Sequence, residues 1–131
     1  MARRRRLGAI MTMEMLLVLP VAVALLMGLI EFSMLWSARN HVQESARAAC
    51  RVATFPGSNQ LAVTNAAQLS LQKPALAQTA LVTVLGGACS GDLVAVRVAV
   101  PMRAAAPDLL GIFGLGFGQA QLAAEAVMRK E

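Results

Sequence analysis

A long apolar run dominates the beginning of the chain and ends at Glu31. No charged residue lies between positions 15 and 30, and Glu14 stands directly before them. A helix over residues 7–30 would be about 36 Å long, which is enough to cross a hydrocarbon core of roughly 30 Å with some tilt. The pattern therefore predicts one transmembrane helix near the N-terminus.

Glu14 is the exceptional residue of this run. A carboxylate at the centre of a bilayer costs roughly 3 kcal/mol on insertion scales, so an acidic residue inside an apolar run is a candidate functional residue. Pro20 follows within the same run and lacks a backbone N–H donor. We expect it to kink the helix, a distortion that transmembrane helices tolerate.

The helical pattern continues beyond the apolar run. Polar residues such as Arg39, Glu44 and Arg47 fall on other faces than a set of apolar residues spaced by three or four positions. One helix is therefore expected from about residue 10 to residue 54, ended by Pro56 and Gly57. The apolar set comprises Leu35, Ala38, Val42, Ala46, Ala49 and Ala53.

The remainder of the chain predicts a small mixed domain. A second, weaker helix is expected over residues 58–72, ended by Pro74. Residues 80–85 and 93–100 are expected to form a hairpin, because the valines at 94, 96, 98 and 100 alternate with other residues. Pro101 should end this ladder.

The last third of the chain contains two different patterns. Residues 107–118 are apolar and glycine-rich, which fits either a short helix or a loop pressed onto the stalk helix. Residues 121–129 alternate and predict a third strand. The fold class is thus α+β: a long N-terminal transmembrane stalk helix, a second short helix and a small antiparallel sheet of about three strands. The stalk helix would take residues 10–55, and the small extracytoplasmic domain residues 56–131.

The distribution of charge gives the topology of the chain. The formal net charge is +5, but residues 3–6 are all arginine and the other eight basic residues face seven acidic ones. A basic cluster before an apolar run keeps the N-terminus in the cytoplasm and places the rest on the far side of the membrane. The excess charge is therefore a topology signal, and no nucleic acid is expected as a partner.

A removable signal peptide is the main competing interpretation of the N-terminal run, because it has the same basic and apolar regions. Two features argue against it. Glu14 lies inside the apolar run, and no small-x-small cleavage site follows Ile30. We therefore expect the apolar helix to remain part of the protein.

The residue inventory does not support an enzyme. The single histidine, His41, has no Cys or carboxylate at a metal-ligand spacing and is expected to be a solvated surface residue. Asp92 and Asp108 stand at turn or helix-start positions. The glycines of residues 111–118 fit no phosphate-binding pattern. We expect no catalytic residue, no metal site and no cofactor.

Cys50 and Cys89 are the only cysteines. If the domain lies outside the cytoplasm, the compartment permits a disulfide between the end of the long helix and the hairpin loop. Such a bridge would stabilise the fold by roughly 4 kcal/mol in the chain-entropy model. Two buried free thiols are the equally weighted alternative.

Several motifs together resemble a known family. Residues 6–20 read Arg-Leu-Gly-Ala-Ile-Met-Thr-Met-Glu-Met-Leu-Leu-Val-Leu-Pro, followed by Gly-Leu-Ile-Glu-Phe ending at Glu31 and Phe32, and by an Ala/Arg-rich stretch over residues 40–53. This block resembles the TadE-like family, minor pseudopilins of tight-adherence (Flp) pilus systems. The C-terminal residues 123–131 are loosely similar to the closing strand of that family. The resemblance implies that Glu31 and Phe32 mark the exit from the membrane.

The resemblance also implies processing of the N-terminus. In this family an aspartic prepilin peptidase removes a short basic leader on the cytoplasmic side, which here corresponds to residues 1–9. The family pattern places a Glu five residues after the cleavage site. Glu14 is sixth if the cut follows Gly8, whereas a cut after Ala9 makes it fifth and leaves Ile10 as the new N-terminus.

The consequence of cleavage is electrostatic. It would remove the arginines and create an α-ammonium near Glu14 in the lipid, and contact between these two groups on neighbouring subunits would offset the cost of burying both charges. The implied partners are the membrane, the prepilin peptidase, other pilins and pseudopilins, and the inner-membrane platform proteins of the pilus. The implied location is the bacterial inner membrane, with possible incorporation into a surface pilus that serves cell adhesion or secretion.

Two interpretations from different functional classes remain at this point. In the first, the protein is a pilin-like structural subunit whose stalk helix packs among other stalks. In the second, it is an uncleaved single-pass anchor of an extracytoplasmic binding or secretion-accessory module, and Glu14 reaches toward the cytoplasmic interface.

Overall fold

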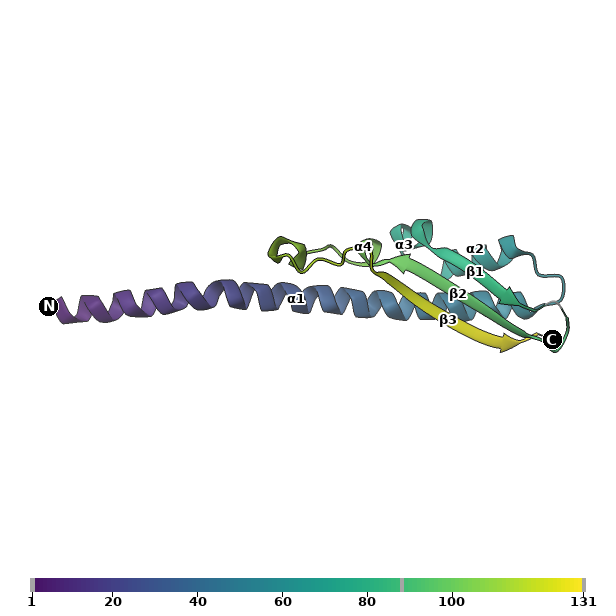
Figure 1. Cartoon of the computed structure of the whole chain (residues 1–131), viewed down its shortest axis with the longest axis horizontal. Helices are drawn as coiled ribbons and strands as arrows, with labels where there is room; N and C mark the ends of the chain where they lie inside the picture. Colours follow the sequence, from purple (N-terminus) through teal and green to yellow (C-terminus); the bar gives the residue numbers. More distant parts are fainter. Residues whose placement is uncertain (1, 88, 131) are drawn as a thin grey trace.

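A single long helix and a small three-stranded sheet make up most of the molecule (Figure 1). The computed structural model describes residues 2–87 and 89–130, with side chains from residue 12 onward. Helix α1 spans Ala2–Thr54, and strands β1, β2 and β3 span Leu81–Gly86, Leu93–Pro101 and Gln121–Arg129. Shorter elements are α2 (Gln60–Ser70), α3 (Pro74–Thr79), α4 (Met102–Ala105) and the 3-10 helix η1 (Leu110–Phe113). The predicted α+β fold is confirmed.

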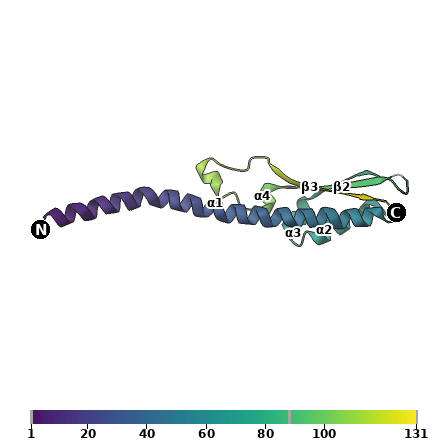
Figure 2. The ribbon, with the colours of Figure 1, turned by 90° about the horizontal axis from the view of Figure 1, so that it is seen from below.

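Helix α1 extends far beyond the rest of the protein (Figure 1). It passes through Pro20 as one helix, and Figure 2 shows a gentle curve in its N-terminal half. Its last residue is Thr54, because Pro56 disfavours the α conformation at the preceding residue and Gly57 adopts a φ of 80°. The second half of α1 lies inside the small domain, where the sheet covers one side and α2 packs beside it (Figure 2).

The sheet is antiparallel, with the strand order β1-β2-β3. The predicted hairpin is present, with Val84 paired to Val96, and β3 adds to the free edge of β2 with Ala126 opposite Val96. The hairpin turn depends on Gly86, which has a φ of 83°. A Cβ at this position would lie 2.5 Å from the carbonyl oxygen of Leu93, so only glycine fits there.

The core forms between the sheet and the C-terminal half of α1. The four alternating valines of β2 point toward α1 and are buried, as the period of two predicts. The buried face of α1 carries small side chains, including Ala38, Ala46 and Ala49. Ser45 on the same helix donates a hydrogen bond of 2.9 Å to the carbonyl oxygen of Ala67 in α2. Small side chains and this buried bond hold α1 close to its neighbours.

Two parts of the sequence prediction need correction. Pro74 does not end the second helix: α2 ends at Ser70, and Pro74 begins α3, since proline is well suited to the first position of a helix. Helix α4 was not predicted. For residues 107–118 both proposed descriptions apply, because the segment is a loop that contains η1 and contacts α1.

Candidate functional site

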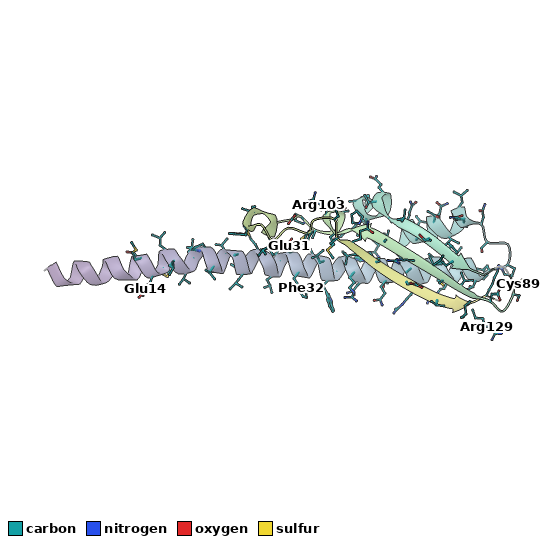
Figure 3. All side chains as sticks on the ribbon, viewed as in Figure 1. Glu14, Glu31, Phe32, Cys89, Arg103 and Arg129 are labelled. Atoms are coloured by element: carbon teal, nitrogen blue, oxygen red, sulfur yellow. The ribbon has the colours of Figure 1, made fainter. Side chains whose placement is uncertain are left out.

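The N-terminal half of α1 is apolar and projects away from the domain (Figures 1 and 3). In the part of the chain that the structure describes, α1 is the one helix long and apolar enough to cross a membrane. All side chains from Met13 to Val21 are exposed in the isolated protein. Apart from Glu14 and Pro20, they are all large and apolar. Such a surface is stable only when lipid or other helices cover it.

Glu14 lies on this exposed part of the helix (Figure 3). The structure therefore places the carboxylate on a helix surface that is available to lipid or to a neighbouring helix. The predicted cleavage region of Gly8, Ala9 and Ile10 continues α1 toward the N-terminus, but these side chains, like those of residues 3–6, lie outside the described side chains.

The two residues of the predicted membrane-exit pair differ in their surroundings on α1. Phe32 is exposed, and its ring centroid lies 6.1 Å from that of Trp36. Glu31 is only 2% exposed and points toward the segment of residues 107–118 (Figure 3), whereas Phe32 is 62% exposed. The Glu31 Oε2 atom accepts a hydrogen bond of 3.2 Å from the backbone N–H of Leu110, while Oε1 is buried without a partner.

Residues 107–118, which we name the apolar loop, fold back along α1 toward its N-terminal half (Figure 1). Inside the loop the Asp108 carboxylate lies close to the backbone of Gly111 and Gly116. A Cβ at Gly111 would lie 2.9 Å from Asp108 Oδ1, and a Cβ at Gly116 would lie 2.8 Å from Oδ2. The two glycines thus provide the room for a charged group to turn into the loop.

Contact between the apolar loop and α1 extends the packed face of the helix. Leu110 and Leu115 line one apolar groove with residues of α1 that include Ala24 and Gly28. A Cβ built on Gly28 would lie 3.7 Å from the Leu110 side chain. Positions 24, 28, 31, 35, 38 and 42 follow steps of four and three, so one stripe of α1 faces first the loop and then the sheet.

The sequence prediction did not include the burial of Glu31, because the apolar set on which it rests begins at Leu35. Glu31 lies four positions before Leu35 on the same face, which is the signal that would have indicated its burial. Its partner Leu110 lies 79 positions away, and no local pattern connects the two.

The two cysteines are free thiols in the structure, so the predicted disulfide is absent from it. Cys50 is fully buried, and its thiol donates long bonds of 3.5 Å to the carbonyl oxygens of Val94 and Ala126. Burial raises the pKa of this thiol above its ordinary value. Cys89 is exposed at the tip of the domain (Figure 3), so the alternative of two buried thiols holds only for Cys50.

The remaining polar residues fill structural positions. Asp92 stabilises the hairpin turn, because its Oδ2 atom accepts a bond of 3.1 Å from the Cys89 N–H. The expectation of a solvated His41 is wrong: the side chain is half-buried against the domain, and Nδ1 is buried without a partner. Among the described residues, no group of three or more His, Cys, Asp or Glu side chains is placed to hold a metal ion.

One apolar helix near the N-terminus, continuous with a small α+β domain, fits the class of membrane proteins with a single candidate spanning segment. Comparison with known families gives a match over part of the chain. The model of the family described as TadE-like protein matches residues 9–51, which is most of α1. The resemblance drawn from the sequence is thus confirmed over these residues, and it connects the chain to a family associated with tight-adherence pilus systems. No curated protein and no solved structure matches the chain.

Proposed function

We propose that this protein is a pilin-like structural subunit, a TadE-like minor pseudopilin that takes part in the assembly of a tight-adherence (Flp) pilus. The observation that carries the proposal is the position of Glu14 on an exposed, otherwise apolar helix surface within the matched residues 9–51. An acidic group there needs a partner, because the lipid offers none.

The proposed partner is the N-terminal ammonium of an adjacent subunit. A prepilin peptidase removes the basic leader after Gly8 or Ala9, and the new N-terminus then lies within two turns of Glu14 on its own helix. The ammonium of one subunit and the Glu14 carboxylate of the next form an ion pair in the lipid, which offsets the cost of burying both charges. Other pilins and the inner-membrane platform proteins are the proposed assembly partners.

The proposed topology follows from the arginines at residues 3–6. Before cleavage they hold the N-terminus in the cytoplasm, with α1 crossing the bacterial inner membrane and the small domain outside. Removal of residues 1–8 or 1–9 takes away this charge and leaves the helix anchored by apolar contacts alone.

The first experiment tests processing. Intact mass and N-terminal sequencing of the membrane-extracted protein should show loss of the leader, with either Ala9 or Ile10 as the new first residue. A full-length chain in the membrane would instead support an uncleaved anchor of an extracytoplasmic module.

The second experiment tests the role of Glu14. The Glu14→Ala and Glu14→Gln variants should insert and be cleaved as the wild type, while recovery of surface pili or of complexes with partner subunits falls about tenfold, as expected when one partner of a buried charge pair is removed. Glu44→Gln is the matched control, because Glu44 is exposed on the same helix beyond the apolar run. Cleaved Glu14→Ala protein that supports wild-type piliation would contradict the ion pair.

A further inference from the structure

The apolar loop presents large side chains that no part of the described domain covers. Ile112, Phe113 and Leu115 are 78%, 50% and 69% exposed. The loop that carries them does not lie at the distal tip of the domain, where Cys89 is found, but at the end of the domain nearer the N-terminal half of α1 (Figures 1 and 3). The loop therefore exposes its apolar surface next to the candidate membrane-spanning segment.

We propose that the apolar loop inserts into the domain-side leaflet of the bilayer, where lipid acyl chains cover Ile112, Phe113 and Leu115. The protein would then contact the membrane through two elements, α1 and this loop. The inference requires that α1 crosses a membrane, and it does not depend on whether the protein enters a pilus.

The depth of the loop follows from its contacts with α1. Leu110 and Leu115 share a groove with Leu25 and Gly28, both of which lie in the charge-free part of the helix. Leu25 precedes Ile30 by five positions, which corresponds to roughly 8 Å along the helix axis. If Ile30 is within the hydrocarbon core, the side chains that pack at the level of Leu25 are within it as well.

Aromatic residues of α1 indicate where the hydrocarbon core of the membrane ends on the side of the domain. Phe32 and Trp36 form an exposed aromatic pair, and Arg39 is the first basic residue after the apolar run. Aromatic side chains of this kind gather at the membrane–water interface. The contacts of the loop with α1 begin closer to the N-terminus than this pair, which is the lipid side of the interface.

Part of the loop backbone is hydrogen-bonded within the protein, which favours a non-helical segment in lipid. Such a segment must satisfy its polar groups within the protein, since the hydrocarbon offers no hydrogen-bond partner. The N–H groups of Leu109, Gly114 and Leu115 donate to carbonyl oxygens within the loop, at 3.0, 3.0 and 3.1 Å. The N–H of Leu110 has no such acceptor in the loop and donates to the buried Glu31 carboxylate instead.

The distribution of charge agrees with insertion. Asp108 is the one charged residue of the apolar loop, and its carboxylate faces Gly111 and Gly116 inside the loop. A loop in water normally carries polar side chains at its tip. Here the tip offers apolar groups to the outside and keeps its single charge inside.

Depth-dependent fluorescence quenching tests the proposal on the full chain. Trp36→Phe removes the native tryptophan, and Leu115→Trp then reports from the loop in vesicles of phosphatidylcholine and phosphatidylglycerol. Replacing the lipids with chain-brominated ones should quench the Leu115→Trp variant roughly twofold or more, as for a side chain among acyl chains. The matched control is Leu69→Trp on α2, where Leu69 is 81% exposed and lies in the domain; it should be quenched little.

Two further measurements keep the result decisive. Ile112→Trp repeats the experiment at a residue that does not line the groove, in case the Leu115→Trp variant disturbs it, and circular dichroism checks that all variants fold. Quenching no greater than that of Leu69→Trp at both loop positions would overturn the proposal. Quenching at both loop positions should be strongest at low protein-to-lipid ratios, because lipid rather than a second copy of the chain then covers the loop.

Discussion

The two halves of α1 have the same backbone and opposite surroundings. From Met13 to Val23 the large apolar side chains of the helix are exposed on every face, whereas from Leu35 to Thr54 small residues form one buried stripe and charged residues occupy the other faces. The first half therefore depends on an external apolar environment, and the second half carries its own in the form of the sheet and α2. The surface of α1 changes from exposed and apolar to partly buried within about two turns. Glu31 and the apolar loop lie at this transition.

This difference predicts that a larger side chain destabilises the protein in the second half of α1 but not in the first. Ala49 is fully buried in the core, so Ala49→Leu overpacks the contact between α1 and its neighbours and should lower the free energy of unfolding by about 1–3 kcal/mol. Ala22→Leu is the matched control, because Ala22 is exposed and both variants have similar helix propensity. Thermal unfolding in detergent micelles, followed by circular dichroism, measures the difference. Equal destabilisation by both variants would show that the buried stripe does not end where the structure places it.

A substitution at the junction between the two halves of α1 should have a smaller and local effect on stability. Glu31→Ala removes the acceptor for the Leu110 N–H and should weaken the attachment of the apolar loop by about 1–3 kcal/mol, leaving the sheet in place. Hydrogen exchange at Leu110 and chymotryptic cleavage at Phe113 should both become faster. Glu44→Ala, at an exposed position of α1, serves as the control. An unchanged exchange rate at Leu110 would mean that the Glu31 bond does not hold the loop.

The smallest expected effect is a difference in thiol reactivity between Cys50, in the buried half of α1, and Cys89, at the hairpin tip. Cys89 should react with a maleimide within minutes and without loss of fold, because it is exposed, while Cys50 should react only when the domain unfolds. Burial raises the pKa of Cys50, so the folded protein holds this proton more tightly than the unfolded chain. The resulting stability is complete below the ordinary value of 9.0 and is lost as the pH rises through the folded pKa. Absence of any free thiol before reduction would contradict the structure and restore the disulfide.

The sequence predicted the elements whose pattern is local. The alternating valines of β2 and the three-and-four spacing after Leu35 report directly which face is buried, because strand and helix periods differ. Proline and glycine at positions 56 and 57 then indicated the end of α1 to within two residues.

The parts that were missed depend on contacts between distant residues. The apolar loop has no helical or strand period in its sequence, and two of its glycines, Gly111 and Gly116, leave room for the Asp108 carboxylate. His41 was assigned to the solvent because its neighbours in the sequence are charged, but in the structure its Nδ1 atom is buried. Of the candidate site, Glu14 and the apolar run followed from the sequence, whereas the pairing of Glu31 with Leu110 required the fold.

The continuity of α1 has a mechanical consequence. No turn or flexible linker separates the apolar half from the half that is built into the domain. If α1 crosses a membrane as proposed, the helix would act as a rigid lever with its pivot in the lipid. The segment from Ile30 to Thr54 is about 36 Å long, and a tilt of roughly 10° at the pivot would displace its far end by about 6 Å. A change in bilayer thickness or in the packing of neighbouring helices thereby reorients the whole domain, and the hairpin tip that carries Cys89 moves the farthest.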